Sequence, residues 1–394
     1  MVGVLTTKQV ASSYGNWLIL LMLGGFMLSA ALEKSRAHRR IALGMVNLFG
    51  GSSGRRLVFG FMAASAILSM WISNAATCLM LLPIAMAVVS QTDNRKLQVA
   101  LLLGIAYAAS VGGIGTPIGT PPNLVFMDNY KKITDGNEIH FSQWMGWALP
   151  IVCVMLPIVG FWLTRGLSKI EPLKLPHVGK WRREEILSLS VFALTALLWI
   201  TRTQPFGGWK ELLGLPEAKD SSVALLGAIA MFLIPNGKGE KLLDWETAKK
   251  IPWSILVLFA GGICIAEAFK ESGLSVELAN ALASFGALPV LLLMGVICLA
   301  VTFLTEVTSN TATTTLLMPI LAAAAVGADM DPLIIMIPAT ISASFAFMLP
   351  VATPPNAIVF GSNKFSVNEM AKEGLVLNLI GVVVVTCVCY LLFG

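Results

Sequence analysis

Charged side chains are scarce in this sequence of 394 residues: Asp, Glu, Lys and Arg together make up 12%, about half the share found in an average soluble domain. So little charge cannot cover the surface of a water-soluble globule of this size. It excludes a cytosolic enzyme, a disordered chain and a soluble nucleic-acid binder. Hydrophobic residues make up 56%, and the mean hydropathy is +0.79. This composition predicts an all-α polytopic membrane protein.

Residues that build metal centres and nucleophilic sites are few and scattered. The three histidines, His38, His140 and His177, lie in charged connecting segments. The six cysteines lie in apolar stretches, and only Cys387 and Cys389 are close together. No HExxH motif or His/Cys/carboxylate cluster occurs. We therefore expect no metal catalysis and no enzyme; a membrane-embedded enzyme is an alternative that no cluster of residues supports.

Runs without charge predict the membrane spans, since a spanning helix needs about 20 apolar residues. Three of these runs are too long for one helix, and each is interrupted near its middle by a polar or Pro/Gly motif, so we expect broken helices there. These three are 57–92, 97–127 and 332–363. The full set is 9–32, 57–92, 97–127, 141–164, 186–201, 221–237, 251–266, 278–305, 307–328, 332–363 and 374–394.

The distribution of Lys and Arg predicts how the chain is threaded. The segment between the runs 141–164 and 186–201 is rich in both residues, which marks it as cytoplasmic by the positive-inside rule. With 57–92 and 278–328 drawn as re-entrant hairpins, most of the 27 Lys and Arg residues fall on the cytoplasmic side. This threading predicts an integral protein of the inner (plasma) membrane with its C-terminus outside.

The chain also contains an internal repeat. Landmarks recur in the same order at separations of 233 to 237 residues, which is hard to obtain by chance. In the predicted threading the two copies have opposite orientations, and inverted repeats are typical of secondary transporters. The matched landmarks are Trp17 and Trp253, Ser73-Asn74 and Ser309-Asn310, Pro83 and Pro319, and Thr120–Asn123 and Thr353–Asn356.

The repeat is incomplete at its start. Two apolar runs, 186–201 and 221–237, precede Trp253, but their counterparts would fall before residue 1. We therefore expect either a fragment or start-site variant of a longer carrier, or a reduced form of the architecture.

Two Ser-Asn motifs mark the expected hairpin tips. A helix over 57–72 would extend about 24 Å, short of the hydrocarbon thickness of about 30 Å, before Ser73-Asn74 breaks it and caps the next helix. The second copy lies within TEVTSNTATTT, residues 305–315, which is dense in hydroxyl groups. Hydroxyls, amide oxygens and freed carbonyls suit Na⁺, and the N-terminus of the following half-helix suits an anion. The alternative is a polar kink in an ordinary span.

Two proline motifs complete the pattern, GGIGTPIGTPPN at 112–123 and LPVATPPN at 349–356. Pro-Pro cannot continue a helix, so the carbonyls before it are left free to coordinate a cation. The alternative is a proline kink that only shapes packing. Glu306, beside the second tip, is an intramembrane carboxylate, and such groups are usually functional. It could tune a cation site or carry a proton; alternatively it is a structural pair with a hydroxyl or backbone group.

At these motifs the chain resembles the divalent anion:sodium symporter family, the carriers of dicarboxylates, citrate and sulfate. The family hallmark is a Ser-Asn-Thr motif at the tip of each of two opposed hairpins, and this chain has Ser309-Asn310-Thr311 intact and Ser73-Asn74-Ala75 altered. The resemblance implies Na⁺ as co-transported ion, at two or more sites. One site would use Ser69, Ser73, Asn74 and Gly119, and the other Thr305, Thr308, Asn310 and Ala352. The substrate carboxylates would contact Asn74, Thr120, Asn310, Thr311, Thr353 and Pro354.

The resemblance also implies a transport domain that moves like an elevator against a scaffold, usually in a homodimer. The expected division is 1–53 as scaffold and cytoplasmic surface helix, 54–164 as the first transport repeat (hairpin 57–92, broken helix 97–127, helix 141–164), 165–287 as scaffold helices, and 288–394 as the second transport repeat (hairpin 288–328, broken helix 332–363, helix 374–394). Ala75 replaces the family threonine and removes one substrate hydroxyl, and the family usually begins with three more spans.

The expected function is therefore secondary-active, Na⁺-coupled transport of a di- or tricarboxylate or a sulfate-like dianion. The expected partners are this small anion and the lipid bilayer, without nucleic acid. Two alternatives stay open: a Na⁺-independent dicarboxylate exchanger and a truncated homologue that does not transport.

Overall fold

The computed structural model describes residues 4–49, 53–134, 136–167, 179–203, 207–274, 277 and 288–394. The regular secondary structure of these ranges is helical, and apart from one isolated bridge between Pro235 and Lys241 they contain no strand. The helices are α1 Thr7–Tyr14, α2 Trp17–Ser35, α3 Ala37–Phe49, α4 Gly54–Ser69, α5 Asn74–Val89, α6 Arg95–Gly113, α7 Pro121–Ile133, α8 Phe141–Leu163, α9 Arg183–Ile200, α10 Gly208–Leu212, α11 Asp220–Leu233, α12 Trp245–Ala248, α13 Trp253–Glu271, α15 Val290–Thr305, α16 Asn310–Gly327, α17 Leu333–Ser342, α18 Pro354–Phe360 and α19 Val367–Phe393.

The expected helical class is confirmed, and several helices have the length and apolarity of membrane spans. Five segments of the described chain qualify: Thr7–Ser35, Arg95–Gly113, Phe141–Leu163, Asn310–Gly327 and Val367–Phe393. Shorter apolar helices, such as α5 and α15, accompany them. Together with the composition, this makes the chain an integral membrane protein.

Two predicted boundaries differ from the structure for local reasons. The run 9–32 contains two helices, because Gly15 ends α1 and the Asn16 side chain caps α2 by accepting from the Leu18 amide. The run 374–394 belongs to a longer helix, α19, which begins within charged sequence after a capping box of Ser366 and Glu369. Charge marks where a helix leaves the apolar region, but capping residues decide where it begins.

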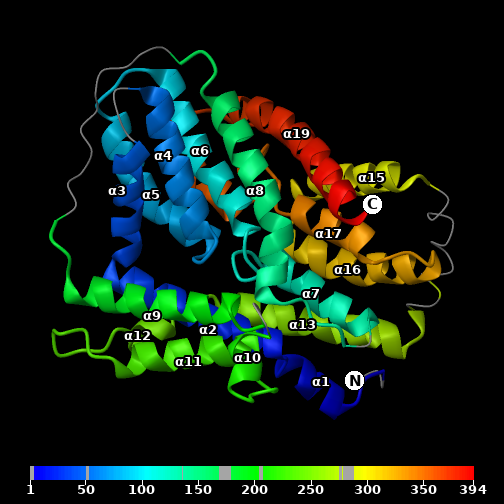
Figure 1. Cartoon of the computed structure of the whole chain (residues 1–394). Helices are drawn as coiled ribbons and strands as arrows, with labels where there is room; N and C mark the ends of the chain where they lie inside the picture. The colour runs from blue at the N-terminus through cyan, green and yellow to red at the C-terminus, as the bar shows by residue number, and fades with distance from the viewer. Residues whose placement is uncertain are drawn as a thin grey trace.

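The helices form two layers (Figure 1). In one layer, α2 packs against α9, α11, α12 and α13, and α1 packs against α13. The other layer holds the two repeats: α4–α8, and α15–α19. In each repeat a helix pair comes first, α4 with α5 and α15 with α16, followed by a broken helix and a long helix. The assignment of the layers to a fixed scaffold and a moving domain stays a prediction.

The two repeats exchange their short helices. Helix α7, which follows the first proline motif, packs on α16 and α17 of the second repeat. Helix α18, which follows the second proline motif, packs on α5 and α6 of the first. The long helices α8 and α19 also contact each other. The repeats are therefore interlocked rather than merely adjacent.

The close approach of α4 and α6 depends on one glycine. A Cβ atom at Gly112 would lie 2.3 Å from the Ala66 carbonyl oxygen and 2.5 Å from its Cα, inside any allowed contact. At Gly44, in the middle of α3, a Cβ atom would meet nothing within 4 Å. These two helical glycines form a matched pair for a test of packing.

We expect Gly112→Ala to lower the free energy of unfolding by about 1–3 kcal/mol, because backbone must move to accept the methyl group. Gly44→Ala should raise it by up to about 1 kcal/mol, since alanine is the better helix former. Thermal unfolding of both variants in detergent checks this. Equal melting temperatures for the two variants would contradict the packing described.

Candidate functional site

Three oxygens converge where the first helix pair is broken. The Ser69 hydroxyl, at the end of α4, lies 2.5 Å from the side-chain oxygen of Asn74 and 2.7 Å from the Ala109 carbonyl oxygen of α6. Ser69 is fully buried. One hydroxyl has one proton, so it can donate to only one of these acceptors at a time. The cluster therefore has more lone pairs than protons, which favours a small cation.

The second repeat builds the same cluster. The Thr305 hydroxyl, at the end of α15, lies 2.7 Å from the side-chain oxygen of Asn310 and 3.0 Å from the Ala343 carbonyl oxygen that follows α17. Thr305 is fully buried, like Ser69. The sequence predicted the hydroxyl and amide members of both clusters. It could not predict the carbonyls of Ala109 and Ala343.

Two predicted cation ligands have other partners. The Ser73 hydroxyl caps α5 by accepting from the Ala76 amide at 3.2 Å. The Thr308 hydroxyl donates to the Leu304 carbonyl at 2.8 Å and lies 2.5 Å from the Thr313 hydroxyl. In the structure these two side chains shape their own turns, and their role as cation ligands stays a prediction.

The proline motifs are held by a pair of equivalent asparagines. The Asn123 amide donates to the carbonyls of Gly113 at 3.2 Å and Thr116 at 2.7 Å. The Asn356 amide donates to the carbonyls of Ala346 and Leu349, both at 3.0 Å. Each asparagine thus ties the start of a short helix to the end of the broken helix before it.

These asparagines also carry free acceptors. The side-chain oxygens of Asn123 and Asn356 are buried without a hydrogen-bond partner among the described residues, and so are the hydroxyls of Ser110 and Ser344. An unpaired buried acceptor is costly, and here it recurs at matching places in both repeats. Asn123 and Asn356 end the two proline motifs, but the sequence alone assigns them no role. Their recurrence in both repeats is the feature that could have indicated one.

Gly119 and Ala352, the remaining predicted cation ligands, lie at equivalent places. A Cβ atom at Gly119 would lie 2.3 Å from the Gly113 carbonyl oxygen, and one at Gly113 would lie 2.7 Å from the Asn74 side-chain oxygen. Gly119 is therefore joined to the first oxygen cluster through Gly113. Ala352 is buried and donates its amide hydrogen to the Leu349 carbonyl at 3.2 Å.

The predicted substrate residues differ in access. Asn74, Asn310 and Thr311 are half-buried at the tips, whereas Thr120 and Thr353 are buried as the N-cap residues of α7 and α18. The Thr353 hydroxyl accepts a hydrogen bond from the backbone amide of Asn356 at 3.3 Å. Pro354, the first residue of α18, is exposed, so a ligand can reach the start of that helix.

Glu306 clamps the second break. Its carboxylate accepts from the amides of Met348 at 2.9 Å and Leu349 at 3.0 Å, and from the Asn378 side chain at 2.7 Å. The Asn378 oxygen in turn accepts from the Phe347 amide at 3.2 Å. Three successive backbone amides are thus satisfied by two side chains. The described partners of Glu306 are all hydrogen-bond donors and both of its oxygens are engaged, which fits the predicted structural pair with backbone groups; a role in tuning a cation site or carrying a proton stays a prediction.

The first repeat uses a different clamp at this point. Met70 stands in the place of Glu306, and its carbonyl accepts a short hydrogen bond from the hydroxyl of Thr116, which stands in the place of Leu349. The two repeats are therefore alike in their oxygen clusters but differ in charge. Only the second carries a carboxylate next to its cluster.

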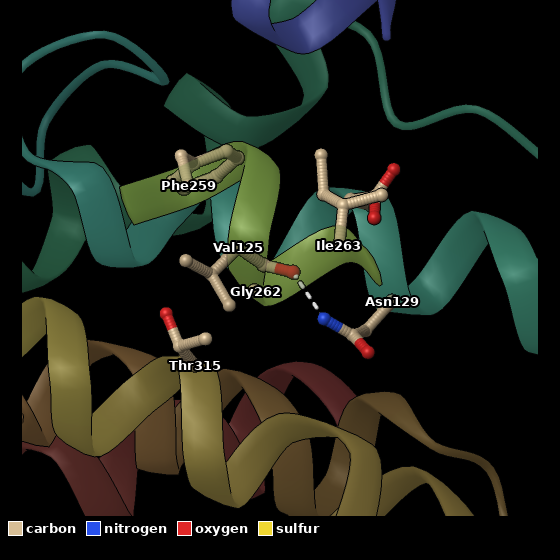
Figure 2. Close-up of a pocket in the computed structure, with 7 residues that line it drawn as sticks. Val125, Asn129, Phe259, Gly262, Ile263 and Thr315 are labelled. Atoms are coloured by element: carbon tan, nitrogen blue, oxygen red, sulfur yellow. Dashed lines mark hydrogen bonds between the residues drawn. The ribbon is translucent and has the colours of Figure 1, made fainter. Parts of the chain in front are cut away.

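Helix α7 is fastened to the other layer. The Asp128 carboxylate accepts from the Asn16 side chain at 2.9 Å and pairs with Lys132 at 2.8 Å; Lys132 reaches the Ile263 carbonyl at 3.5 Å. Beside this group, α7, α13 and α16 enclose a cavity of about 10 Å³, the size of one water (Figure 2). Gly262 and Thr315, both labelled in Figure 2, line this cavity and pack closely, since a Cβ atom at Gly262 would lie 2.4 Å from Cγ2 of Thr315.

Comparison with known proteins then identifies the family to which the chain belongs. The citrate transporter family model (CitMHS) matches residues 1–338. The chain belongs to this family. It is 39% identical to the sodium-dependent dicarboxylate transporter SdcS of Staphylococcus saprophyticus over 99% of this chain and 79% of the relative. It is 40% identical to SdcS of Staphylococcus aureus, over 98% of this chain and 78% of the relative.

Two solved structures share the fold. The YdaH transporter of Alcanivorax borkumensis superposes with a TM-score of 0.67 at 12% identity, covering 98% of this chain and 89% of that chain. MtrF of Neisseria gonorrhoeae gives a TM-score of 0.67 at 13% identity, covering 98% and 83%. The resemblance inferred from the motifs is confirmed, and the protein is a membrane carrier, not an enzyme.

Replacing Glu306 tests the clamp. We expect Glu306→Gln to lower the free energy of unfolding by about 2–4 kcal/mol, because an amide nitrogen would face buried backbone donors. The double variant Glu306→Met, Leu349→Thr installs the clamp of the first repeat and should recover part of that loss. Thermal unfolding in detergent measures both. A Glu306→Gln protein that melts with the wild type would show that the carboxylate does not hold this segment.

Proposed function

We propose that the protein carries a di- or tricarboxylate across the plasma membrane together with Na⁺. The observation that supports this most directly is the pair of equivalent oxygen clusters, Ser69-Asn74-Ala109 and Thr305-Asn310-Ala343, each short of protons. The relatives are named sodium-dependent dicarboxylate transporters, which agrees with this ligand chemistry. A sulfate-like dianion is a second substrate of the same charge.

In this proposal one Na⁺ binds at each cluster. Hydroxyl, amide and carbonyl oxygens at broken helices are the ligands that transporters use for Na⁺. The unpaired side-chain oxygens of Asn123 and Asn356 add acceptors nearby. The Glu306 carboxylate adds negative charge to the second site alone, so we expect that site to hold its Na⁺ more tightly.

The substrate anion then binds between the tips. Helices α5 and α16 begin at Asn74 and Asn310, and their first amide groups suit carboxylate oxygens. The hydroxyls of Thr120, Thr311 and Thr353 complete the proposed set, with Pro354 at its edge. Ala75 offers no hydroxyl where the family has threonine, so the substrate loses one hydrogen bond on that side.

Transport in this proposal is an elevator movement of the two repeats against the layer of α2, α9, α11 and α13, within a homodimer. The re-entrant hairpins carry the tips, and the C-terminus lies outside. The Asp128 contacts with Asn16 and the Lys132 contact with Ile263 join the two layers, so they must break during each cycle. A Na⁺-independent exchanger and a homologue that does not transport are the alternatives.

Substitution of the tip asparagines tests the function. We expect Asn74→Ala and Asn310→Ala each to reduce Na⁺-driven uptake of labelled succinate into proteoliposomes by at least about 100-fold, because each loses a cluster oxygen and a tip amide. Gly44→Ala, where a Cβ atom would meet nothing within 4 Å, serves as a transport-competent control. If the wild type takes up neither dicarboxylate, citrate nor sulfate with or without a Na⁺ gradient, the proposed function is wrong.

Ligand-dependent melting separates the alternatives. Na⁺ should raise the melting temperature, and succinate should raise it further only when Na⁺ is present, because a ligand at 100 times its Kd adds about 2.7 kcal/mol. Choline chloride at equal ionic strength is the control. Stabilisation by succinate without Na⁺ favours the exchanger, and no stabilisation by either favours the homologue that does not transport.

A further inference from the structure

A second cavity lies between the two layers, and no member of the oxygen clusters lines it. It has a volume of about 410 Å³ and separates the corner between α2 and α3 from one face of α5. Its lining is charged on one side and apolar on the other: Glu33, Arg36, His38 and Arg39 face Ala76, Leu79 and Met80. In the predicted threading this cavity opens on the cytoplasmic side.

The charged side of the cavity is held by a fixed corner. Arg36 has a left-handed backbone, with φ of 60°, and neighbouring groups lock it. The Ser35 hydroxyl donates to the Leu32 carbonyl at 3.0 Å, and the Ser35 carbonyl accepts from Arg182 at 2.8 Å. The His38 ring lies 2.8 Å from the Leu32 carbonyl. The backbone that carries Arg36 and Arg39 is therefore set in place before any ligand arrives.

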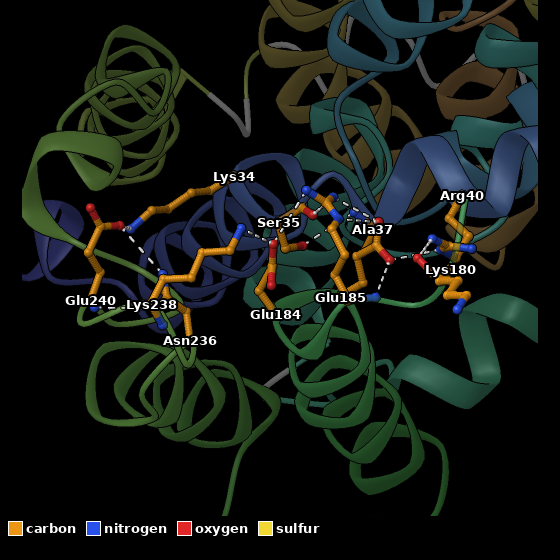
Figure 3. A network of polar contacts seen from close by, with 11 residues as sticks. Lys34, Ser35, Ala37, Arg40, Lys180, Glu184, Glu185, Asn236, Lys238 and Glu240 are labelled. Carbon is orange, nitrogen blue, oxygen red and sulfur yellow. Dashed lines mark hydrogen bonds and ion pairs between the residues drawn. The ribbon is translucent and has the colours of Figure 1, made fainter. Parts of the chain in front are cut away.

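Neighbouring cations are neutralised, but these two arginines are not. Lys34 pairs with Glu240 at 3.3 Å, Arg40 with Glu185 at 2.8 Å, and Lys238 with Glu184 at 2.6 Å. Figure 3 shows this network across the α2–α3 corner.

Within the described ranges, Arg36 and Arg39 form no ion pair, and both are exposed. Burial lowers the pKa of His38, the hydrogen bond to the Leu32 carbonyl opposes this shift, and the charges of Arg39 and Arg36 add to it. Glu33 is the one acidic group in the lining. The cavity therefore carries a net positive charge that comes from its guanidinium groups.

The apolar side of the cavity leads to the first tip. Ala76 lies in the first turn of α5, and its amide donates to Ser73, next to Asn74. Leu79 and Met80 continue the same face one turn further on. The cavity thus extends from two unpaired arginines to the helix start at which the substrate is proposed to bind.

We propose that this cavity is the cytoplasmic vestibule of the carrier, in which Arg36 and Arg39 hold the carried dianion on its way to or from the Asn74 tip. The inference rests on the proposed function. Charges of one sign beside low-dielectric walls concentrate an oppositely charged ligand and speed its association. The two guanidinium groups match the two charges of a dicarboxylate, and neither is needed once the anion reaches the tip.

Transport measured separately from each face tests this. In inside-out vesicles, the double variant Arg36→Gln, Arg39→Gln should raise the KM for succinate by about 5–10-fold at low ionic strength, with an unchanged maximal rate. In right-side-out vesicles its KM should equal that of the wild type. Added choline chloride at about 0.5 M should abolish the difference, because the Debye length falls to a few Å.

Controls keep the outcomes distinct. Arg56→Gln, Lys250→Gln removes the same charge away from the cavity and should leave both KM values unchanged. Arg39→Glu, which alters no left-handed residue, should raise the inside-out KM further than Arg39→Gln.

An equal change in KM on both faces, or no change on either face, contradicts the proposal that the cavity is a cytoplasmic vestibule. So does an effect that appears only in vesicles containing phosphatidylglycerol, which would make the cavity a lipid headgroup site. Absence of wild-type uptake from either face would instead refute the proposed function.

Discussion

The structure depends on satisfying backbone groups where apolar helices end among buried residues of a membrane protein. The hydrocarbon region offers no water, so each free amide and carbonyl there needs a partner from the chain. At the break after α4, Ser69 and Asn74 meet the Ala109 carbonyl, and at the break after α15, Thr305 and Asn310 meet the Ala343 carbonyl. The same requirement has the same solution twice. Each solution leaves more hydrogen-bond acceptors than donors, and this surplus is the reason we propose a cation site at each break.

The two halves of the molecule are equivalent in oxygen geometry but unequal in charge. Thr116 donates to the Met70 carbonyl in the first repeat, where the clamp is neutral. In the second repeat, Glu306 accepts from Met348 and Leu349. A carboxylate satisfies two amides at once, but it also leaves a net negative charge in the apolar layer. That charge is tolerated where a cation compensates it. If Na⁺ binds at both clusters as proposed, this asymmetry predicts a higher affinity at the second site, which would then be occupied first.

Much of this architecture was predictable, because apolar runs and duplicated motifs can be recognised from short stretches of sequence. The breaks at Ser73-Asn74 and Ser309-Asn310 follow from residue type and spacing, whereas the hydroxyl and amide members of each cluster were implied by the family resemblance. The carbonyl members do not, because every residue has a carbonyl and only the fold selects one. The role of Asn378, the partner of Glu306, was not predictable for a different reason. It lies within the apolar sequence of α19 and far along the chain.

The exchange of short helices gives the two sites a physical connection. Helix α7 starts at the break of the first repeat, where Asn123 ties it to Gly113, yet it packs on α16, the helix that begins at Asn310. Helix α18 starts at the second break and packs on α5, the helix that begins at Asn74. A cation that orders one break therefore also fixes a helix resting against the opposite tip. If Na⁺ binds at both clusters and the anion between the tips, as proposed, this interlocking couples each cation to the opposite tip and makes anion binding depend on both cations.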